Sequence, residues 1–513
     1  MSLLRNASTV GGWTMLSRVV GFVRDALIAA TLAAGPVADA FFVALRLPNM
    51  FRSLAAEGAF AAAFVPLFAG QLEAEGRPAA VRFAEDVLAV MLAAMLVALV
   101  AAELAMPYLV AALAPGFVGD TERFALTTLF SSITFPYLLC MSLVALLGSV
   151  LNALYRFATA AAAPVLMNLV MIAALLLAGD ALATPGHALA WAVAVAGVAQ
   201  LVWLAYDAGR AGISLRLRVP RLTPGVRRML ALMLPGVFGA GVQQLNLLVS
   251  TVVASFRDGA VSTLYYADRI SQLPLAVIGI AVGVALLPLL SRQLKAGDGA
   301  GAAESQNRAV EFTLLLTLPA AVALLAIPAP IVAVLFEHGR FGAEESRATA
   351  AALAAFAAGL PAYVLVKVLL PSFYAREDIA TPVRVAVLAL VVNAVLAVVL
   401  GRLWGATGIA IAASTAAWMN AAGLAFVLRR RAHFVMDARL SARLPRMAGA
   451  ALLMGAALLA GERALAAAFA GPVWIQAPAL AALVVGGVAV FAGLALVLGA
   501  ARMADVRAAL RKG

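Results

Sequence analysis

The sequence predicts an all-α polytopic membrane protein with fourteen transmembrane helices, arranged as two six-helix lobes followed by two C-terminal helices. Its composition, its apolar runs and the distribution of its basic residues support this prediction. Of the 513 residues, 65% are hydrophobic and only 12% are charged. A typical soluble domain is about 45–50% apolar and about 25% charged. A soluble chain of this composition would expose too much apolar surface to water.

The apolar runs give the order of the predicted helices. A membrane-spanning helix needs about 20 mostly apolar residues. Fourteen segments meet this requirement: 9–33, 38–69, 84–112, 123–152, 158–179, 187–207, 228–256, 260–291, 310–336, 345–374, 379–401, 406–428, 446–468 and 474–501. The first segment is expected to be a membrane helix and not a signal peptide, because Arg18, Arg24 and Asp25 interrupt its apolar stretch.

The basic residues predict the orientation of these helices. If the N-terminus is cytoplasmic, 25 of the 37 Lys and Arg residues fall on the cytoplasmic side, 6 on the opposite side and 6 within the predicted helices. Cytoplasmic loops of membrane proteins carry such an excess of Lys and Arg. Both termini are therefore expected to be cytoplasmic. The net charge of +12 is assigned to these loops and not to nucleic-acid binding.

Composition and motifs exclude several other classes of protein. Cys140 is the only cysteine, so the chain has no disulfide framework and no cysteine-based metal site. His187, His338 and His433 lie far apart near predicted loops, which argues against a metal cluster. No P-loop motif is present, and neither are the H-E-x-x-H and G-x-S-x-G motifs.

Two weak internal similarities predict how the helices are grouped. The stretch AFFVALRLPNMF resembles LYYADRISQLPL, and LNALYRFATAAAAPV resembles PSFYAREDIATPVRV. Both pairs are six helices apart, and an even offset preserves orientation, as in transporters built from parallel repeats. We therefore expect an N-terminal lobe in residues 1–210, a C-terminal lobe in residues 211–431, and helices 13 and 14 with a cytoplasmic tail in residues 432–513.

Nine charged residues within or beside the predicted helices are candidate functional residues. They are Arg18, Arg24, Arg46, Arg52 and Arg269, and Asp25, Asp39, Glu57 and Asp268. On insertion scales, each such charge at a helix centre costs about 2.5–3.5 kcal/mol. The side chains must therefore reach the interface, form structural ion pairs, or face a hydrated cavity. The seven-residue spacings of Arg18 with Asp25 and of Asp39 with Arg46 would allow ion pairs on one helix face.

The cavity interpretation predicts an anionic ligand. A guanidinium group suits bidentate contact with phosphate oxygens, and a low-dielectric wall strengthens its field. The ligand is thus expected to be a phosphate or diphosphate. The carboxylates would hold the arginines apart in its absence, or bind a cation or proton.

Several of these stretches also resemble the signatures of a known family. The long segment SRVVGFVRDALIAATLAAGPVADAFFVALRLPNMFRSLAAEGAF, with YYADRISQLPLAVIGIAVG, LFEHGRFGAEES and VKVLLPSFYAREDIATPVRVA, is similar to the MurJ (MviN) family of lipid II flippases of bacterial peptidoglycan synthesis. The resemblance covers nearly the whole chain. It implies a MATE-like fold in the bacterial cytoplasmic membrane, a cationic cavity between two lobes, and a groove for the polyprenyl tail at helices 13 and 14.

The resemblance also implies roles for the candidate residues. The lipid diphosphate and head group would contact Arg18, Arg24, Arg52 and Arg269. Charge partners or gating residues would be Asp25, Asp39, Arg46, Glu57 and Asp268. The expected activity is transport and not catalysis, without a cofactor, coupled to the membrane potential or a monovalent cation. The expected partners are lipid II, membrane lipids and cell-wall synthesis proteins. The predicted helix 228–256 contains no acid, so the sequence places no cation site there.

Three alternatives remain at this stage. The first is a flippase for another polyprenol-diphosphate-linked saccharide, or a related multidrug or oligosaccharide exporter; the basic cavity argues against cationic drugs. The second is a scaffold that recruits cell-wall enzymes, which would not need arginines in mid-helix. The third is a lipid-diphosphate enzyme, for which we would expect acids clustered in a loop near a membrane face.

Overall fold

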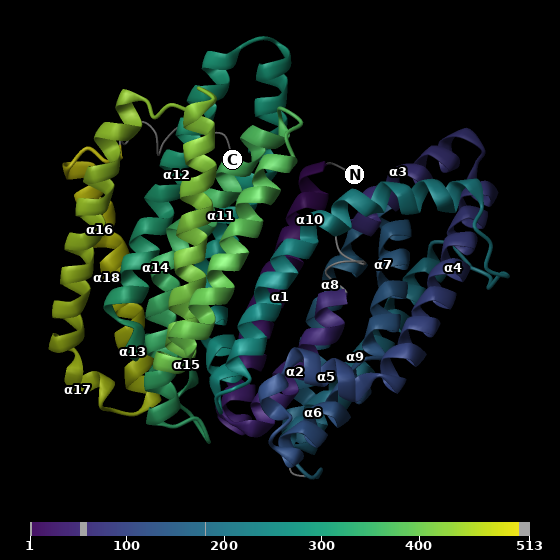
Figure 1. The fold of residues 1–513 in the computed structure, drawn as a ribbon, viewed down its shortest axis with the longest axis horizontal. Helices are drawn as coiled ribbons and strands as arrows, with labels where there is room; N and C mark the ends of the chain where they lie inside the picture. Colours follow the sequence, from purple (N-terminus) through teal and green to yellow (C-terminus); the bar gives the residue numbers. More distant parts are fainter. Residues whose placement is uncertain (1–2, 52–58, 180, 502–513) are drawn as a thin grey trace. The chain divides into compact units, whose positions relative to one another are not determined.

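Helices are the only regular secondary structure in the part of the chain that the structure describes (Figure 1). The computed structural model describes the backbone of residues 3–51, 59–179 and 181–501, and the side chains of these residues except 3–8, 51, 235–243 and 276–285. This described part contains eighteen α-helices and one short 3-10 helix. The prediction of an all-α fold is confirmed. The chain forms two compact units, Met1–Ser262 and Thr263–Gly513, which we describe separately.

Unit 1 contains the first ten α-helices and the start of the eleventh. Their bounds are α1 Leu3–Leu32, α2 Pro36–Phe51, α3 Ala59–Ala74, α4 Arg77–Leu104, α5 Met106–Leu113, η2 Pro115–Phe117, α6 Thr121–Thr134, α7 Tyr137–Ala153, α8 Phe157–Ala178, α9 Pro185–Arg210, α10 Pro224–Ala254 and α11 Ala260–Lys295. Two predicted runs are each interrupted once. The run 84–112 breaks at Ala105 between α4 and α5, and the run 123–152 breaks beside Pro136 between α6 and α7.

A row of aromatic rings forms part of the core of unit 1. Phe60, Phe64 and Phe68 lie one turn apart on α3, where their rings stack with centroids 5.4 and 5.5 Å apart. The ring of Phe64 also stacks on Phe83 of α4 at 5.5 Å. All four side chains are buried. Such stacking adds to the free energy of area burial, so α3 and α4 are firmly joined. The first turns of α10 pack on the same two helices.

Unit 2 contains the rest of α11 and the helices that follow it. Their bounds are α12 Gly299–Ala326, α13 Pro328–Phe336, α14 Ala343–Tyr374, α15 Ala380–Arg430, α16 Ala438–Ala464, α17 Ala466–Phe469 and α18 Val473–Val497. The predicted run 310–336 breaks at Ile327 between α12 and α13. The predicted lobe boundary at residues 210 and 211 was drawn from sequence repeats and stays a prediction. The division between the compact units falls at Ser262 and Thr263, inside α11.

The long helix α15 joins two predicted spans, 379–401 and 406–428. Within it, Trp404 has φ −126° and Gly405 has φ 57° and ψ −134°, so the helix is broken there by a sharp bend. Only glycine adopts the conformation of Gly405 readily. A Cβ atom on Gly408 would collide with the carbonyl oxygen of Leu400. The two halves of α15 therefore meet in a very tight turn.

One buried carboxylate fastens α16 to α12. Glu311 of α12 is only 6% exposed. Its oxygens accept hydrogen bonds from Arg439 of α16 at 3.0 and 3.1 Å, and Glu311 also pairs with Arg443 and Arg308. Arg308 in turn pairs with Asp437, the residue that precedes α16. These contacts position the C-terminal helices on the rest of unit 2.

The turn between α14 and α15 is held by a second carboxylate. Asp378 accepts hydrogen bonds from the amide of Thr381 at 3.0 Å and from Arg431 at 2.5 Å. Its partial burial acts to raise the pKa, but these hydrogen bonds outweigh it and lower the pKa of Asp378 to about 2. The carboxylate is therefore ionised throughout the physiological pH range.

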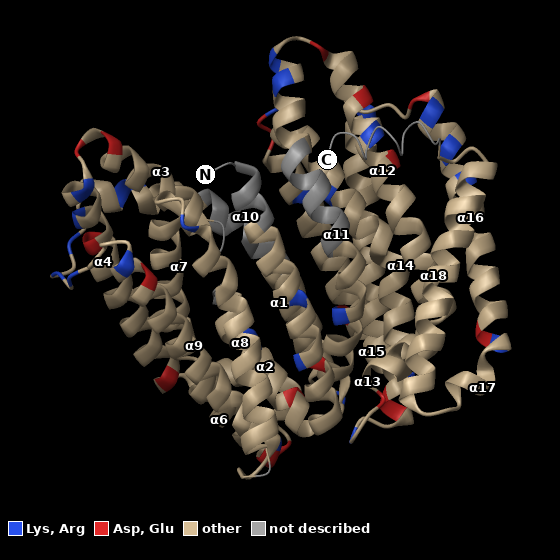
Figure 2. Cartoon of the chain, turned by 180° about the vertical axis from the view of Figure 1, so that it is seen from behind, with Lys and Arg blue, Asp and Glu red and all other residues tan. Residues whose placement is uncertain are grey.

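The described helices are long and apolar enough for a multi-pass membrane protein. Over the described residues, nine helical stretches of at least 18 residues have the length and composition of a membrane span, with α6 and α7 together counted as one of them. One of the nine, α15, covers two of the predicted spans. The exact count of fourteen stays a prediction. Figure 2 shows most charged residues at helix ends and in the connecting turns, with isolated ones along helices such as α1.

Candidate functional site

Arg24 and Asp25 form a buried ion pair inside α1. Arg24 is 7% exposed and Asp25 is 3% exposed. The guanidinium donates to Asp25 Oδ1 from Nε at 3.0 Å and from Nη2 at 2.6 Å, and its Nη1 donates to Asn168 Oδ1 of α8 at 2.8 Å. Arg24 lies eight residues before the end of α1, which is about 12 Å along the helix axis. We call Arg24, Asp25 and Asn168 the Arg24 site.

A glycine on α1 explains how Asn168 reaches this position. A Cβ atom on Gly21 would lie 3.1 Å from Nδ2 of Asn168, so a side chain at this position would force Asn168 to shift. The same amide donates to the carbonyl oxygen of Ser17 at 3.0 Å. Asn168 therefore joins the two helices while its oxygen orients Arg24. The polar groups of the site satisfy one another, as a low-dielectric environment requires.

Asp39 lies at the start of α2 and is completely buried. It accepts hydrogen bonds from the amide of Gly259 at 2.9 Å, from the amide of Ser262 at 2.8 Å and from the Ser262 hydroxyl at 2.7 Å. It also pairs with Arg123 of α6. Gly259 directly precedes α11 and Ser262 lies in its first turn, where the N–H groups have no partner within the helix. We call this network, with Asp258, the Asp39 clasp.

Arg123 is fixed on three sides within the clasp. Its guanidinium lies 3.8 Å from the ring centroid of Phe117, and its Nη1 donates to Asp258 Oδ1 at 2.6 Å. Beside it, the amide of Gly116 donates to the Ser255 hydroxyl at 3.0 Å, and a Cβ atom on Gly116 would collide with the Ser255 backbone. The turn between α10 and α11 is thus seated against the short helix η2.

The other candidate residues of unit 1 are neither part of the Arg24 site nor part of the Asp39 clasp as these are defined above. Nε of Arg46 on α2 donates to the Thr251 hydroxyl on α10 at 3.2 Å, and Arg46 is half-buried. Arg18 is exposed on α1. Arg52 and Glu57 lie outside the described residues. The structure thus brings Arg24 and Asp25 together, and it places Asp39 in a different network.

The two predicted residues of unit 2 are neighbours on α11. Arg269 donates to the Tyr265 hydroxyl at 2.9 Å, and its guanidinium lies 4.7 Å from the centroid of the Tyr265 ring. Asp268 accepts a hydrogen bond from Gln272. Both side chains are half-buried. Among the described residues, no three His, Cys, Asp or Glu side chains converge as a metal site would require.

Sequence reasoning missed the neutral and connecting members of both networks. Asn168, Ser262 and Arg123 were not candidates. An uncharged residue in a helix carries no large insertion cost, and Arg123, the first residue of its predicted helix, was counted among the six basic residues on the side opposite the cytoplasm. One local signal was available for Arg123. Asp120 accepts a hydrogen bond from the Arg123 amide at 3.1 Å, which is the N-cap pattern that starts a helix. It places Arg123 in the first turn of α6.

A helical bundle that buries arginine–carboxylate pairs within its apolar helices has the character of a membrane transporter. Two solved structures share the fold. A structure described as the inward-facing conformation of a multidrug resistance MATE family transporter matches with a TM-score of 0.67 at 16% identity, covering 83% of this chain and 98% of that one. Another, described as lipid II flippase MurJ in an inward closed conformation, matches with a TM-score of 0.78 at 23% identity, covering 95% and 98%.

The particular family follows from the sequence comparisons. The chain belongs to the lipid II flippase MurJ family, whose model matches residues 28–473. A probable lipid II flippase MurJ of Rhizobium meliloti (strain 1021) is 46% identical, covering all of this chain and 97% of the relative. The lipid II flippase MurJ of Burkholderia cenocepacia is 37% identical over 88% of this chain and 89% of its own length. The family resemblance noted in the sequence is confirmed.

Proposed function

We propose that this chain is a lipid II flippase, which moves the lipid-linked peptidoglycan precursor from the inner to the outer leaflet of the bacterial cytoplasmic membrane. Membership of the family and full-length identity of 46% to a relative of that name support the proposal. The activity is transport by alternating access and not catalysis. Both termini lie in the cytoplasm, as the excess of basic residues on that side suggests.

The Arg24 site is the observation on which the mechanism rests. Moving a bare diphosphate through hydrocarbon is prohibitively costly, because a charged group loses its hydration there. A guanidinium that already has partners costs less to keep in the membrane than an isolated one. When a diphosphate arrives, its oxygens replace Asp25 at Nε and Nη2 of Arg24, while Asn168 continues to orient the group. The exchange conserves the hydrogen bonds of Arg24, and the displaced carboxylate of Asp25 competes with the ligand for the guanidinium, which makes binding reversible.

Further residues complete the proposed head-group site. Arg18, Arg52 and Arg269 are assigned to the diphosphate and head group, and Asp25, Asp268, Arg46 and Glu57 to their charge partners. The planar guanidinium groups of these arginines match the geometry of phosphate oxygens. Lipid II is the proposed substrate, and the polyprenyl tail remains in lipid along α16 and α18. Cell-wall synthesis proteins are proposed as further partners.

The Asp39 clasp supplies a gating contact. It holds the first turn of α11 against α2 and α6, and α11 then continues into unit 2. If the switch between inward and outward access moves α11, the hydrogen bonds of the Asp39 clasp have to break or move together with the helix. The energy for the cycle comes from the membrane potential or a monovalent cation. A ligand drives such a switch only if it binds the two states with different affinity.

The test uses cells depleted of this protein and supplied with variants. An enzyme that cleaves only precursor exposed on the outer leaflet reports the flipped fraction. Depletion should lower this fraction while total precursor rises, and Arg24→Gln should fail to restore it. Arg463→Gln is the matched control, because Arg463 is an exposed arginine in the last turn of α16. An unchanged exposed fraction on depletion would contradict lipid II flipping, and full rescue by Arg24→Gln would contradict the assigned site.

A further inference from the structure

The linker between α9 and α10 alternates basic and apolar side chains that are exposed. Residues 214–222, with the sequence SLRLRVPRL, form no helix, and we call them the basic–apolar linker. Leu217 is 69% exposed, Val219 is 71% exposed and Leu222 is 53% exposed. The arginines between them, Arg216, Arg218 and Arg221, are exposed as well. A loop bathed in water gains nothing from large exposed aliphatic side chains.

The backbone of the linker is nevertheless held in place on α4. Glu85 of α4 is 4% exposed and accepts hydrogen bonds from the amide of Arg216 at 3.1 Å and from Nε of Arg218 at 2.5 Å. Before the linker, Ile213 is buried, and after it Val226 is completely buried in the core shared by α3 and α4. Fixed at both ends and in the middle, the linker presents its aliphatic and basic side chains outward as a defined surface.

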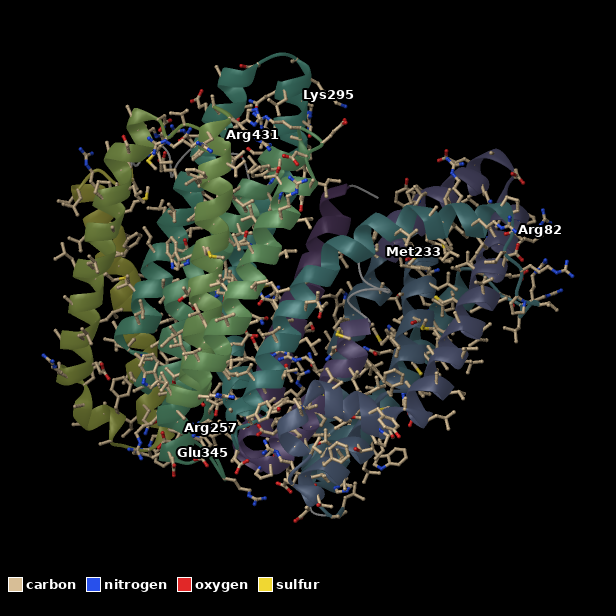
Figure 3. The ribbon with its side chains drawn as sticks, in the orientation of Figure 1. Arg82, Met233, Arg257, Lys295, Glu345 and Arg431 are labelled. Atoms are coloured by element: carbon tan, nitrogen blue, oxygen red, sulfur yellow. The ribbon has the colours of Figure 1, made fainter. Side chains whose placement is uncertain are left out.

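The position of the linker along the axis of α4 indicates which part of the membrane this surface contacts. Glu85 lies eight residues after the start of α4 at Arg77, which is about 12 Å along the axis. Further along, the flank of α4 exposes Val97 at 70% and Val100 at 59%, as a lipid-facing helix does. Figures 1 and 3 show the linker on the outer flank of α4, near the labelled Arg82. The linker therefore lies where the lipid-facing surface begins, at the level of lipid head groups.

We infer that the basic–apolar linker is a membrane-surface anchor that binds the anionic phospholipids of the leaflet it faces. Arginine pairs with lipid phosphate groups, and neighbouring aliphatic side chains enter the boundary between head groups and acyl chains. Glu85 already neutralises Arg218, so Arg216, Arg221 and the exposed Arg227 at the start of α10 supply the free positive charge. A soluble acidic partner would account for the arginines, but it would have to bind on a flank that continues directly into lipid.

This anchor has a consequence for α10. The linker passes into α10 at Pro224, and Val226 and Met229 in the first two turns of α10 are buried in the core shared with α3 and α4. Lipid bound at the linker therefore stabilises the position in which α10 begins. The inference stands independently of the identity of the transported lipid.

The test places a fluorophore on the linker and measures its contact with defined lipids. The full-length protein, with Cys140→Ser and Val219→Cys, is labelled and reconstituted in vesicles of equal parts phosphatidylcholine and phosphatidylglycerol. Brominated acyl chains, which quench fluorescence on contact, are carried by either lipid in turn. The matched control is Val118→Cys in the same background, because Val118 is a 55% exposed valine in a turn beside acidic residues.

The expected result is stronger quenching by brominated phosphatidylglycerol than by brominated phosphatidylcholine at position 219, and no such preference at position 118. Each surface arginine contributes about 1 kcal/mol, or about a fivefold preference. The combined variant Arg216→Gln, Arg221→Gln and Arg227→Gln should lose the preference while keeping its elution volume and its position-118 signal. Equal quenching by the two lipids, absence of quenching, or a preference that survives in the variant would each overturn the inference.

Discussion

The Asp39 clasp yields a quantitative prediction for Asp39→Asn. The asparagine oxygen retains both hydrogen bonds from Ser262, but its NH₂ group faces two other donors, the Gly259 amide and Arg123. A hydrogen bond to a charged group is worth about 1.5–3 kcal/mol, and a buried unsatisfied donor costs about 1–3 kcal/mol. Arg123 keeps its ion pair with Asp258. The local cost is therefore about 3–5 kcal/mol.

Hydrogen exchange of the segment 256–262 measures this cost directly. Local opening should become about two to four orders of magnitude more frequent in Asp39→Asn, because exchange follows the free energy of opening. Asp258→Asn is the matched control. The Asp258 side chain is 84% exposed, so its ion pair should contribute no more than about 1 kcal/mol. Equal protection in the two variants would refute the view that Asp39 holds the start of α11.

Three further changes test other contacts. In Gly21→Leu, the new side chain should displace Asn168 and push α8 away from α1, which should lower the free energy of unfolding by about 1–3 kcal/mol. An unchanged melting temperature in detergent together with normal transport would refute this. Glu311→Ala removes the carboxylate that pairs with the buried Arg443, at a cost of about 3–5 kcal/mol. Exchange in residues 435–446 should therefore accelerate, whereas the exposed Glu304→Ala should change nothing. Because folding lowers the pKa of Asp378, its ionised carboxylate stabilises the folded state fully above the ordinary aspartate pKa of 3.8. This stabilisation is lost as the pH falls through about 2. Protection of residues 375–381, corrected for intrinsic exchange, should fall in that window, and a flat profile would speak against the ion pair.

Much of the fold was predictable because long apolar runs have few alternatives. Each run has to form a helix in a membrane, since its backbone groups find partners only within the segment. The interruptions carry a local signal that the hydropathy of the runs does not show. Ala105 and Ile327 break helices within apolar sequence, and each stands one or two residues before a proline, Pro107 and Pro328, in the first turn of the next helix. Proline disfavours a continuous helix through the residues that precede it, so these breaks were predictable from the prolines and not from the hydropathy.

Only some charged residues of the candidate site were predictable from the sequence. Arg24, Asp25 and Asp39 stand out because a charge in an apolar helix is costly, whatever its partner. The partners depend on which helices lie together, which a single sequence does not specify. Spacing along one helix was a weak guide. Arg24 pairs with the adjacent Asp25, and Asp39 pairs with Arg123, which is 84 residues away in the chain.

The tight turn within α15 bears on how the protein is made. Trp404 and Gly405 reverse the chain with almost no loop, and the close approach of Gly408 to Leu400 leaves room for no larger residue. Because no loop separates them, we expect the two halves to enter the bilayer together as a helical hairpin. Lengthening this turn with a glycosylation acceptor should then lower the yield of inserted protein.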